Sequence, residues 1–214
     1  LNDKTALAEI VVANSILDQN NATDAAGYFK KIWNGETITP QLGNISITTT
    51  SGIGGYGAMY WQYLDKMENI SGTTSGLTVV KQLYLQKMTL TGIQLVPIDE
   101  KTVLKVGDLV ITNLEFTADR EMQYVHMRDL RASCFEPLNV LSSYKYLQGM
   151  GYYESTGDAS SNYFISKLPK GKFTVEYEMH VTHKGTFSSG ITHIQCMYAP
   201  EYTSYSKGFR IEVQ

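Results

Sequence analysis

Two glutamates of one predicted strand are the first candidates for chemistry in this chain. Glu176 and Glu178 stand two residues apart, so they share one face of an extended segment and lie about 7 Å apart along it. Two carboxylates at such a distance are compatible with the acid/base chemistry of glycoside hydrolysis. Alternating glutamates on the solvated face of a strand are far commoner, however. We therefore predict no catalytic residue and rank an enzyme last among the functions considered.

The four histidines do not follow a metal-binding pattern. His180 and His183 are three residues apart on a predicted strand and point to opposite faces, while His126 and His193 stand in other segments without an HxH or HExxH motif. The glycine-rich segment SGIGGYG, residues 51–57, lacks the Lys-Ser/Thr pair of a phosphate-binding loop. No serine stands in a GxSxG setting. The sequence therefore predicts neither a metal nor a cofactor.

Tyrosines crowd a long stretch, residues 135–162, that shows only short apolar runs. The stretch is interpreted either as an excursion that contacts a ligand or as a hairpin. If the tyrosines are exposed on a loop, they form a surface that binds glycans or proteins. If they pack the loop onto a sheet they have no such role, and packing is the better interpretation. The candidate surface consists of Tyr144, Tyr146, Tyr152, Tyr153 and Tyr163.

Composition and charge restrict the class of protein. The 214 residues carry a net charge of −3 and show no basic stripe, which argues against nucleic acid as a partner. No apolar run approaches the roughly 20 residues of a membrane-spanning helix. The 15 tyrosines and the many threonines favour β-structure.

The two cysteines leave two possibilities open. Cys134 and Cys196 are far apart in sequence, and they either pair across a sandwich or remain buried free thiols. A zinc site has no support, because neither cysteine has a second one nearby.

The first part of the chain is expected to hold one helix and a few strands. Apolar residues at helical spacing predict a helix over residues 4–18, and short strands are expected over 28–33, 35–40 and 44–52. An aromatic strand, AMYWQYLDKM, is predicted from residue 58. A Gly/Ser/Thr-rich linker over residues 68–76 then places a domain boundary, giving domains 1–76 and 77–214.

The second part is predicted to be an antiparallel β-sandwich. Within residues 168–187 the apolar positions Phe173, Val175, Tyr177, Met179 and Val181 alternate with polar ones, which indicates a central strand between two tight turns. Strands are also expected over residues 77–88, 109–119, 121–132, 190–200 and 207–213. Seven or more strands joined by turns are typical of a mainly β, immunoglobulin-like sandwich.

Several separated motifs in this second part resemble the C-terminal domain of bacterial alpha-2-macroglobulin family proteins. They are a Val-Gly-Asp turn, an Asp-Arg pair, DxRAxxxEP, LPKGxxxxEY and MYAPEY, followed by Ser206 and Gly208. They fall at residues 106–108, 119–120, 129–137, 168–177 and 197–202. Residues 4–18 resemble, more weakly, the last helix of the family's thioester domain. Residues 28–64 resemble part of its CUB-like β-domain.

The resemblance implies a non-catalytic part of a protease trap, a broad endopeptidase inhibitor. In such proteins a protease cleaves a bait region, and a collapse exposes a Cys-Gln thioester that couples to the protease. Both features lie upstream of the region that this chain resembles, and neither cysteine has a CxEQ setting. The implied role of the final domain is to shield or position the thioester domain before activation.

The resemblance also implies partners and a compartment. Partners would be proteases, met through the full-length protein, and neighbouring domains of the same chain. Half of an interrupted β-domain leaves open sheet edges, so oligomerisation of this chain through those edges, or disorder of residues 1–76, is expected as well. The implied location is the cell envelope, in the periplasm, with any lipoprotein anchor upstream.

Overall fold

The computed structural model describes residues 8–18, 30–49, 57–70, 75–90 and 92–214. By contacts within the chain, it divides into two compact units, residues 1–62 and 63–214. Nearly all regular structure is antiparallel β-sheet, so the predicted mainly β fold is confirmed. No helix among the described residues is long and apolar enough to cross a membrane.

The first unit contains a three-stranded sheet where a helix was expected. The sheet has the order β2-β1-β3, formed by β1 (Glu9–Val12), β2 (Ser15–Ile16) and β3 (Ile45–Thr48), with the 3-10 helices η1 (Gly35–Thr37) and η2 (Pro40–Gly43). The helix predicted over residues 4–18 is therefore wrong for the part described. Ala13 and Asn14 have φ of 51° and 65°, as in the two-residue turns that join hairpin strands. The β-branched run Ile10 to Val12 favours a strand over a helix.

Three other predicted strands of this part do not form. The segment predicted as a strand over residues 35–40 instead contains η1 and the start of η2. Residues 30–34 and 57–66 are described without regular secondary structure. In the second segment Trp61 is 49% exposed and Tyr60 74% exposed, so the aromatic pattern does not reflect burial within the described chain.

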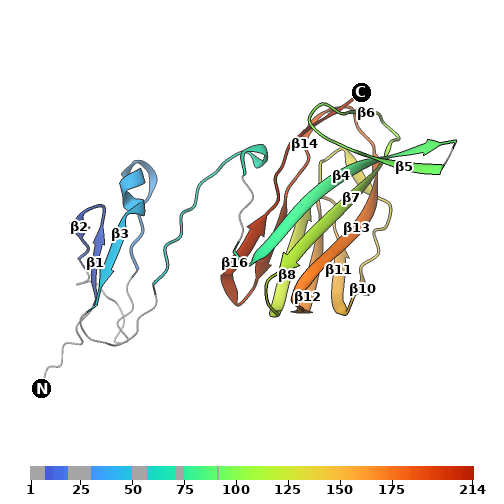
Figure 1. The fold of residues 1–214 in the computed structure, drawn as a ribbon. Helices are drawn as coiled ribbons and strands as arrows, with labels where there is room; N and C mark the ends of the chain where they lie inside the picture. Colours follow the sequence, from blue (N-terminus) through green and yellow to red (C-terminus); the bar gives the residue numbers. More distant parts are fainter. Residues whose placement is uncertain (1–7, 19–29, 50–56, 71–74, 91) are drawn as a thin grey trace, which may run out of the picture. The chain divides into compact units, whose positions relative to one another are not determined.

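The second unit is a sandwich of two main sheets (Figure 1). The five-stranded sheet has the order β5-β4-β7-β13-β9: β5 (Gly92–Pro97), β4 (Leu77–Thr89), β7 (Leu109–Ala118), β13 (Gly171–Val181) and β9 (Phe135–Pro137). The six-stranded sheet has the order β10-β11-β12-β8-β15-β16: β10 (Ser143–Leu147), β11 (Met150–Thr156), β12 (Ser160–Leu168), β8 (Met122–Leu130), β15 (Thr192–Cys196) and β16 (Ala199–Tyr205). The predicted sandwich is confirmed.

A small third sheet accompanies the sandwich. It has the order β14-β17-β6, with β14 (Gly185–Ser188), β17 (Arg210–Val213) and β6 (Val103–Leu104), and β17 runs parallel to β6. One short 3-10 helix, η3 (Met67–Asn69), precedes β4.

The strand predicted to be central lies within a sheet. β13 pairs along its length with β7 and near its end with β9. Phe173, Val175, Met179 and Val181 are buried, as their alternation predicts, and Phe173 stacks on Phe116 of β7 with ring centroids 5.7 Å apart. The irregular stretch 135–162 contains β9 and the β10–β11 hairpin, so the hairpin interpretation holds. Its period-two signal is short because β9 and β10 have only three and five residues, and both lie at sheet edges.

The core contains two clusters of buried side chains. The larger one fills the space between the two main sheets and includes Leu114, Phe116, Met127, Tyr163 and Ile165. The second one packs the five-stranded sheet against β6 and β17 through residues such as Leu83, Met179 and Ile211. The sandwich therefore depends on residues from 77 to 213.

Gly190 marks a close backbone approach between the connection from β14 to β15 and the end of β8. Its φ is +71°, and a Cβ there would lie 2.1 Å from the carbonyl oxygen of Leu130. Gly149 also has a positive φ, +85°, but a Cβ there meets nothing within 4 Å. A side chain at Gly149 would therefore meet backbone strain alone, whereas a side chain at Gly190 would meet both backbone strain and steric overlap.

We expect Gly190→Ala to destabilise the sandwich by about 3 kcal/mol or more, because strain and overlap add. Gly149→Ala should cost only the strain of the left-handed backbone, about 1–2 kcal/mol. Urea unfolding followed by circular dichroism measures both. Equal losses for the two variants would contradict the close approach at Gly190.

Candidate functional site

The five tyrosines of the predicted interaction surface lie on opposite faces of the six-stranded sheet. Tyr144 and Tyr146, on the edge strand β10, are 84% and 77% exposed. Tyr152 and Tyr163 face the core and are buried, with their ring centroids 6.0 Å apart. Burial raises the pKa of both phenols, more strongly at Tyr163. The structure thus brings Tyr144 and Tyr153 together but separates them from the two buried tyrosines.

A row of rings crosses the outer face of this sheet. Tyr144 pairs with Tyr153, Tyr153 with Phe164, and Phe164 with His126, each on the neighbouring strand. The His126 and Phe164 rings are 4.8 Å apart and nearly parallel, so each covers a face of the other. Each of these two rings therefore has one of its faces already covered by the other. This arrangement is less suited to stacking on sugars than a row of free ring faces.

His193 lies on the same outer face. Its ring stacks on Tyr205 at 4.4 Å, and its Nε2 lies 2.9 Å from Thr203 Oγ1. Burial, and secondarily the proximity of His126, lower the pKa of His193. His193 is therefore mainly neutral at pH 7. Among the described residues, no group of three or more His, Cys, Asp or Glu side chains could hold a metal.

The two glutamates considered for catalysis are exposed on β13. Glu176 accepts a hydrogen bond from Asn113 Nδ2 at 2.5 Å. Both glutamates border a small cavity of about 160 Å³, whose wall also includes the ion-paired Lys145 and Glu154. Glu176 is thus held by a neutral amide on the solvated face of the sheet.

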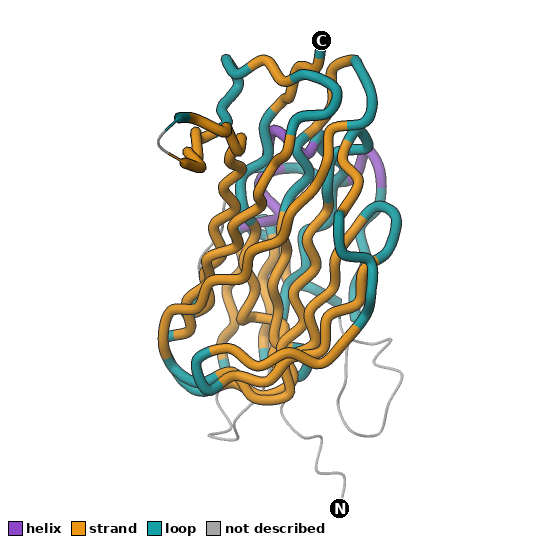
Figure 2. Tube along the Cα trace, turned by 90° about the vertical axis from the view of Figure 1, so that its right-hand side faces the viewer, coloured by secondary structure: helices purple, strands orange, loops and turns teal. Residues whose placement is uncertain are grey.

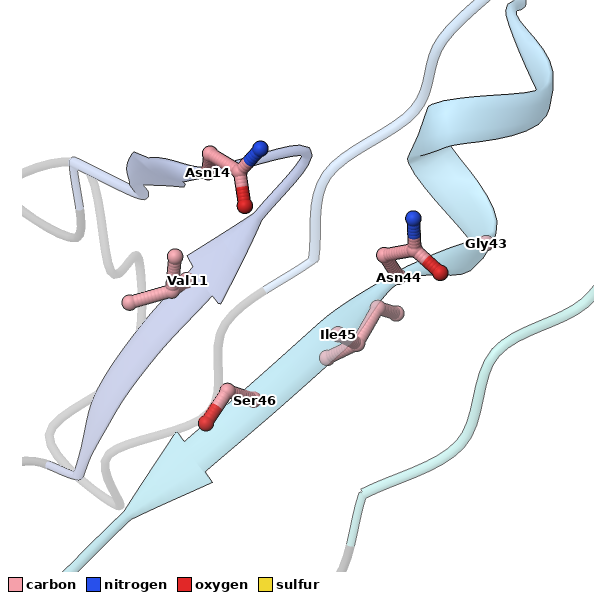
Figure 3. Close-up of a pocket in the computed structure, with 6 residues that line it drawn as sticks. All are labelled: Val11, Asn14, Gly43, Asn44, Ile45 and Ser46. Atoms are coloured by element: carbon pink, nitrogen blue, oxygen red, sulfur yellow. The ribbon is translucent and has the colours of Figure 1, made fainter.

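A second, shallower hollow lies in the first unit. It has a volume of about 320 Å³ and lies between the β1–β2 hairpin and β3, as Figure 3 shows. Its wall consists of Val11, Asn14, Gly43, Asn44, Ile45 and Ser46. None of these lining residues is ionisable, so they offer only hydrogen bonds and apolar contact. Residues 50–56 of the glycine-rich segment lie outside the described residues.

The most tightly bonded polar group of the sandwich is the carboxylate of Asp129, which is fully buried. Lys81 Nζ lies 2.9 Å from Asp129 Oδ1, and the two side chains are 2% and 0% exposed. Thr192 Oγ1 donates to the same oxygen at 2.6 Å, and the Tyr177 hydroxyl donates to Oδ2. Burial, and then the charge of Asp129, raise the pKa of Tyr177 well above its ordinary value, so this phenol stays protonated and donates.

The Lys81 ammonium is also held by the backbone. It donates to the carbonyl oxygens of Leu130 at 2.6 Å and Ser189 at 3.2 Å, in addition to its ion pair. A buried charge is tolerated only when it is paired and hydrogen-bonded, and here both charges meet that condition. Sequence reasoning missed Lys81. Its signal is that a lysine stands on the apolar face of a strand, between Val79 and Leu83.

Arg131 extends the polar interior toward the β11–β12 turn. Its Nη2 donates to Gly157 O at 2.9 Å and to Ser161 Oγ at 3.1 Å, and its guanidinium lies 5.9 Å from the centre of the Tyr177 ring. Asp129 and Arg131 are the first two residues of the DxRAxxxEP motif. The motif therefore specifies buried polar contacts in the sandwich.

The other motif residues lie at turns and corners. Asp108 Oδ2 accepts from the Lys105 N–H at 2.8 Å, and Gly107 N donates to Val181 O at 2.8 Å. Arg120 pairs with Asp119 at 2.9 Å and donates to the Tyr202 hydroxyl at 3.2 Å. These contacts fix the ends of strands.

The MYAPEY motif differs, because two of its apolar side chains are exposed. Met197 is 57% and Tyr198 81% exposed, in the turn between β15 and β16. Tyr124 of β8, 54% exposed, contacts Tyr198 edge to face at 5.2 Å, and its carbonyl oxygen accepts from Met197 N at 2.9 Å. We call these three residues the Met197 patch. It is an apolar surface on a backbone held by hydrogen bonds.

The two cysteines are free and buried. Burial raises the pKa of Cys134 to about 11, and Cys196 Sγ lies 3.3 Å from Gln123 O. The interpretation as buried free thiols therefore holds. Such thiols are inert at neutral pH.

Comparisons with known proteins agree on one family. Residues 76–201 match the model of the bacterial alpha-2-macroglobulin MG10 domain. A comparison with curated protein sequences gives no match. The structure resembles Salmonella alpha-2-macroglobulin reacted with methylamine, with a TM-score of 0.52 and 17% identity over 68% of this chain and 10% of that one.

Two Escherichia coli structures are similar in the same way. One is native alpha-2-macroglobulin from domain MG7 to the C-terminus, with a TM-score of 0.53 and 14% identity over 67% of this chain and 24% of that one. The other is alpha-2-macroglobulin activated by porcine elastase, with a TM-score of 0.52 and 14% identity over 67% of this chain and 13% of that one. At these identities the structures show a shared fold. The chain spans between a tenth and a quarter of their lengths.

The buried Lys81–Asp129 pair should dominate the mutational sensitivity of the sandwich. Lys81→Met and Asp129→Leu each leave one buried charge without its partner, which costs about 3–5 kcal/mol. The double variant leaves no unpaired charge, so it should lose less stability than the sum of the two single variants. Urea unfolding measures this double-mutant cycle.

The exposed pair between Lys167 and Glu121, at 3.1 Å, is the matched control. Lys167→Met should change the stability by about 0–1 kcal/mol. Additive losses at Lys81 and Asp129 would show that the two charges do not depend on each other.

Proposed function

Because the chain belongs to the bacterial alpha-2-macroglobulin family, we propose that it is a non-catalytic, C-terminal region of a protease-trapping protein. The observation that carries the proposal is the match of residues 76–201 to the MG10 domain. Related support is that similar structures are of alpha-2-macroglobulins activated by porcine elastase or by trypsin. Proteases would then be the partners of the full-length protein, and the chain would act within the cell envelope.

The proposed role of the sandwich is to shield and position the thioester domain before activation. The Met197 patch is the surface we assign to this contact. Met197 and Tyr198 are apolar and solvent-exposed, yet they stand on a backbone bonded to β8, so they can cover a reactive group without reordering. Clustered exposed apolar side chains of this kind mark interaction surfaces.

Binding through the tyrosine-rich segment 144–163 is the weaker alternative. Tyr152 and Tyr163 are buried, so only Tyr144, Tyr146 and part of Tyr153 could contact a partner. A glycan that stacks on rings would also find one face of His126 and one face of Phe164 already covered by their mutual stack.

The first unit supports a proposal about partners. Among its described residues, Val12 is the single buried hydrophobic side chain, while Ile16, Ile47 and Trp61 are 71%, 57% and 49% exposed. A unit of about 60 residues with so small a core is not stable alone. We propose that residues 1–76 complete a CUB-like β-domain with strands from elsewhere in the same protein. Without those strands, the open edges favour self-association.

In the full-length protein, Met197→Ala combined with Tyr198→Ala should admit small nucleophiles to the thioester. We expect at least a several-fold faster reaction of the uncleaved protein with methylamine, measured by mass spectrometry. Tyr144→Ala combined with Tyr146→Ala, which also removes two exposed side chains, should leave this rate unchanged. An unchanged rate in the Met197/Tyr198 variant would overturn the shielding role, as would a protein that takes up no methylamine after cleavage.

The chain of residues 1–214 should self-associate in light scattering, whereas the full-length protein should not. Ile45→Lys with Ile47→Lys places charges on β3 and should shift the chain toward monomers. The matched control is Val80→Lys, which adds a charge at an exposed position of the sandwich. A monomeric chain whose first unit resists proteolysis would contradict the incomplete domain.

A further inference from the structure

The strand β4 leaves the body of the sandwich before it ends. It pairs with β7 from Leu77 to Gln86, and beyond that point its only paired neighbour among the described strands is β5. Figures 1 and 2 show the resulting two-stranded ribbon, which projects away from the sheets. A ribbon of two strands is marginally stable in water unless something packs against it.

The apolar alternation of β4 changes face where the ribbon begins. In the body, the odd-numbered residues Val79, Leu83 and Leu85 point into the core. In the ribbon the apolar residue is Met88, an even-numbered position on the opposite face. Lys87 and Thr89 take the odd-numbered positions, on the face that Leu85 shares with Val96. The ribbon is therefore apolar on the side that points away from the core.

Cross-strand pairing extends this apolar side over both strands. Met88 pairs with Ile93, and Leu95 lies opposite Gln86 on the same face. Met88, Ile93 and Leu95 are 83%, 62% and 45% exposed, and we call these three residues the outer ribbon face. Leu90, next to the turn, is fully exposed.

The core of this sandwich cannot cover the outer ribbon face. A shift of register by one residue would turn Met88 inward, but it would also turn Leu83 and Leu85 outward. The covering surface therefore comes from outside the sandwich. Its chemistry follows from the ribbon: β5 has no charged residue from Gly92 to Pro97, and Lys87 is on the opposite face. The complement is an uncharged, apolar surface.

We propose that the outer ribbon face docks onto an apolar surface of another domain of the same polypeptide. This inference rests on the proposed function, which places the chain in a protein as long as its relatives. This chain matches 10% of the Salmonella structure and 24% of an E. coli one, so most of the polypeptide in such a protein lies outside it. An edge strand that stays in water is normally protected by charges or proline, and β5 has a proline only at its end, Pro97. If another domain covers β5 permanently, the strand needs neither charges nor an internal proline for protection.

Hydrogen exchange tests the docking. The amides of residues 92–96 should exchange at least about tenfold more slowly in the full-length protein than in the chain 1–214. In the full-length protein, Met88→Gln with Ile93→Gln should raise the exchange rate there to that of the isolated chain. Lys87→Gln with Thr89→Gln changes the opposite face and should leave the protection intact.

Equal exchange rates in the full-length protein and in the chain would overturn the docking. Protection that grows with protein concentration would overturn it too, because the occupant would then be a second copy. Protease trapping is measured on the same preparations. A protein that traps proteases with an unprotected ribbon refutes the docking alone, and a protected ribbon without trapping refutes the proposed function alone.

Discussion

The buried carboxylate of Asp129 is the constraint around which the sandwich is built. It belongs to the six-stranded sheet, and it receives Lys81 and Tyr177 from the five-stranded sheet as well as Thr192 from its own. Apolar contacts between two sheets tolerate small slips, whereas an ion pair with two further donors fixes one relative position. A buried charge is costly unless its partners are in place, so the network penalises every other alignment of the sheets.

Most residues of the family motifs likewise hold the strands of the sandwich in position. They lie at the buried carboxylate, at the neighbouring arginine and at the turns that start and end strands, and none of them forms a catalytic arrangement among the described residues. The exposed part of MYAPEY is the exception, since packing does not account for Met197 and Tyr198. This contrast is the reason that we assign contact with another domain to that turn.

The sandwich could be predicted from the sequence because its central strands alternate cleanly. Phe173 to Val181 and Leu109 to Ala118 each bury one face, and period two is the direct signature of that burial. The β10–β11 hairpin was harder to predict, because β11 carries a tyrosine on each face, Tyr152 and Tyr153, and only the fold decides which one is buried. Lys81 was missed because charge is normally taken as a sign of exposure.

The first unit shows where periodicity misleads. Residues 4–18 have apolar spacing that fits a helix, yet the described part forms a hairpin whose turn uses Ala13 and Asn14 with positive φ. The aromatic segment 58–64 alternates like a strand but pairs with no strand in the described chain. A pattern of apolar residues records that a surface is covered, and it does not say which part of a protein covers it.

The parallel pairing of β17 with β6 has a consequence for biosynthesis. Ile211 and Val213 complete the second core cluster, and Gln214 N donates to Leu104 O at 2.9 Å, across more than 100 residues of sequence. Ser75 likewise bonds to Thr203. Contacts of such long range form late and slowly. The sandwich therefore cannot close until residues 203–213 have left the ribosome, and its exposed strands need protection until then.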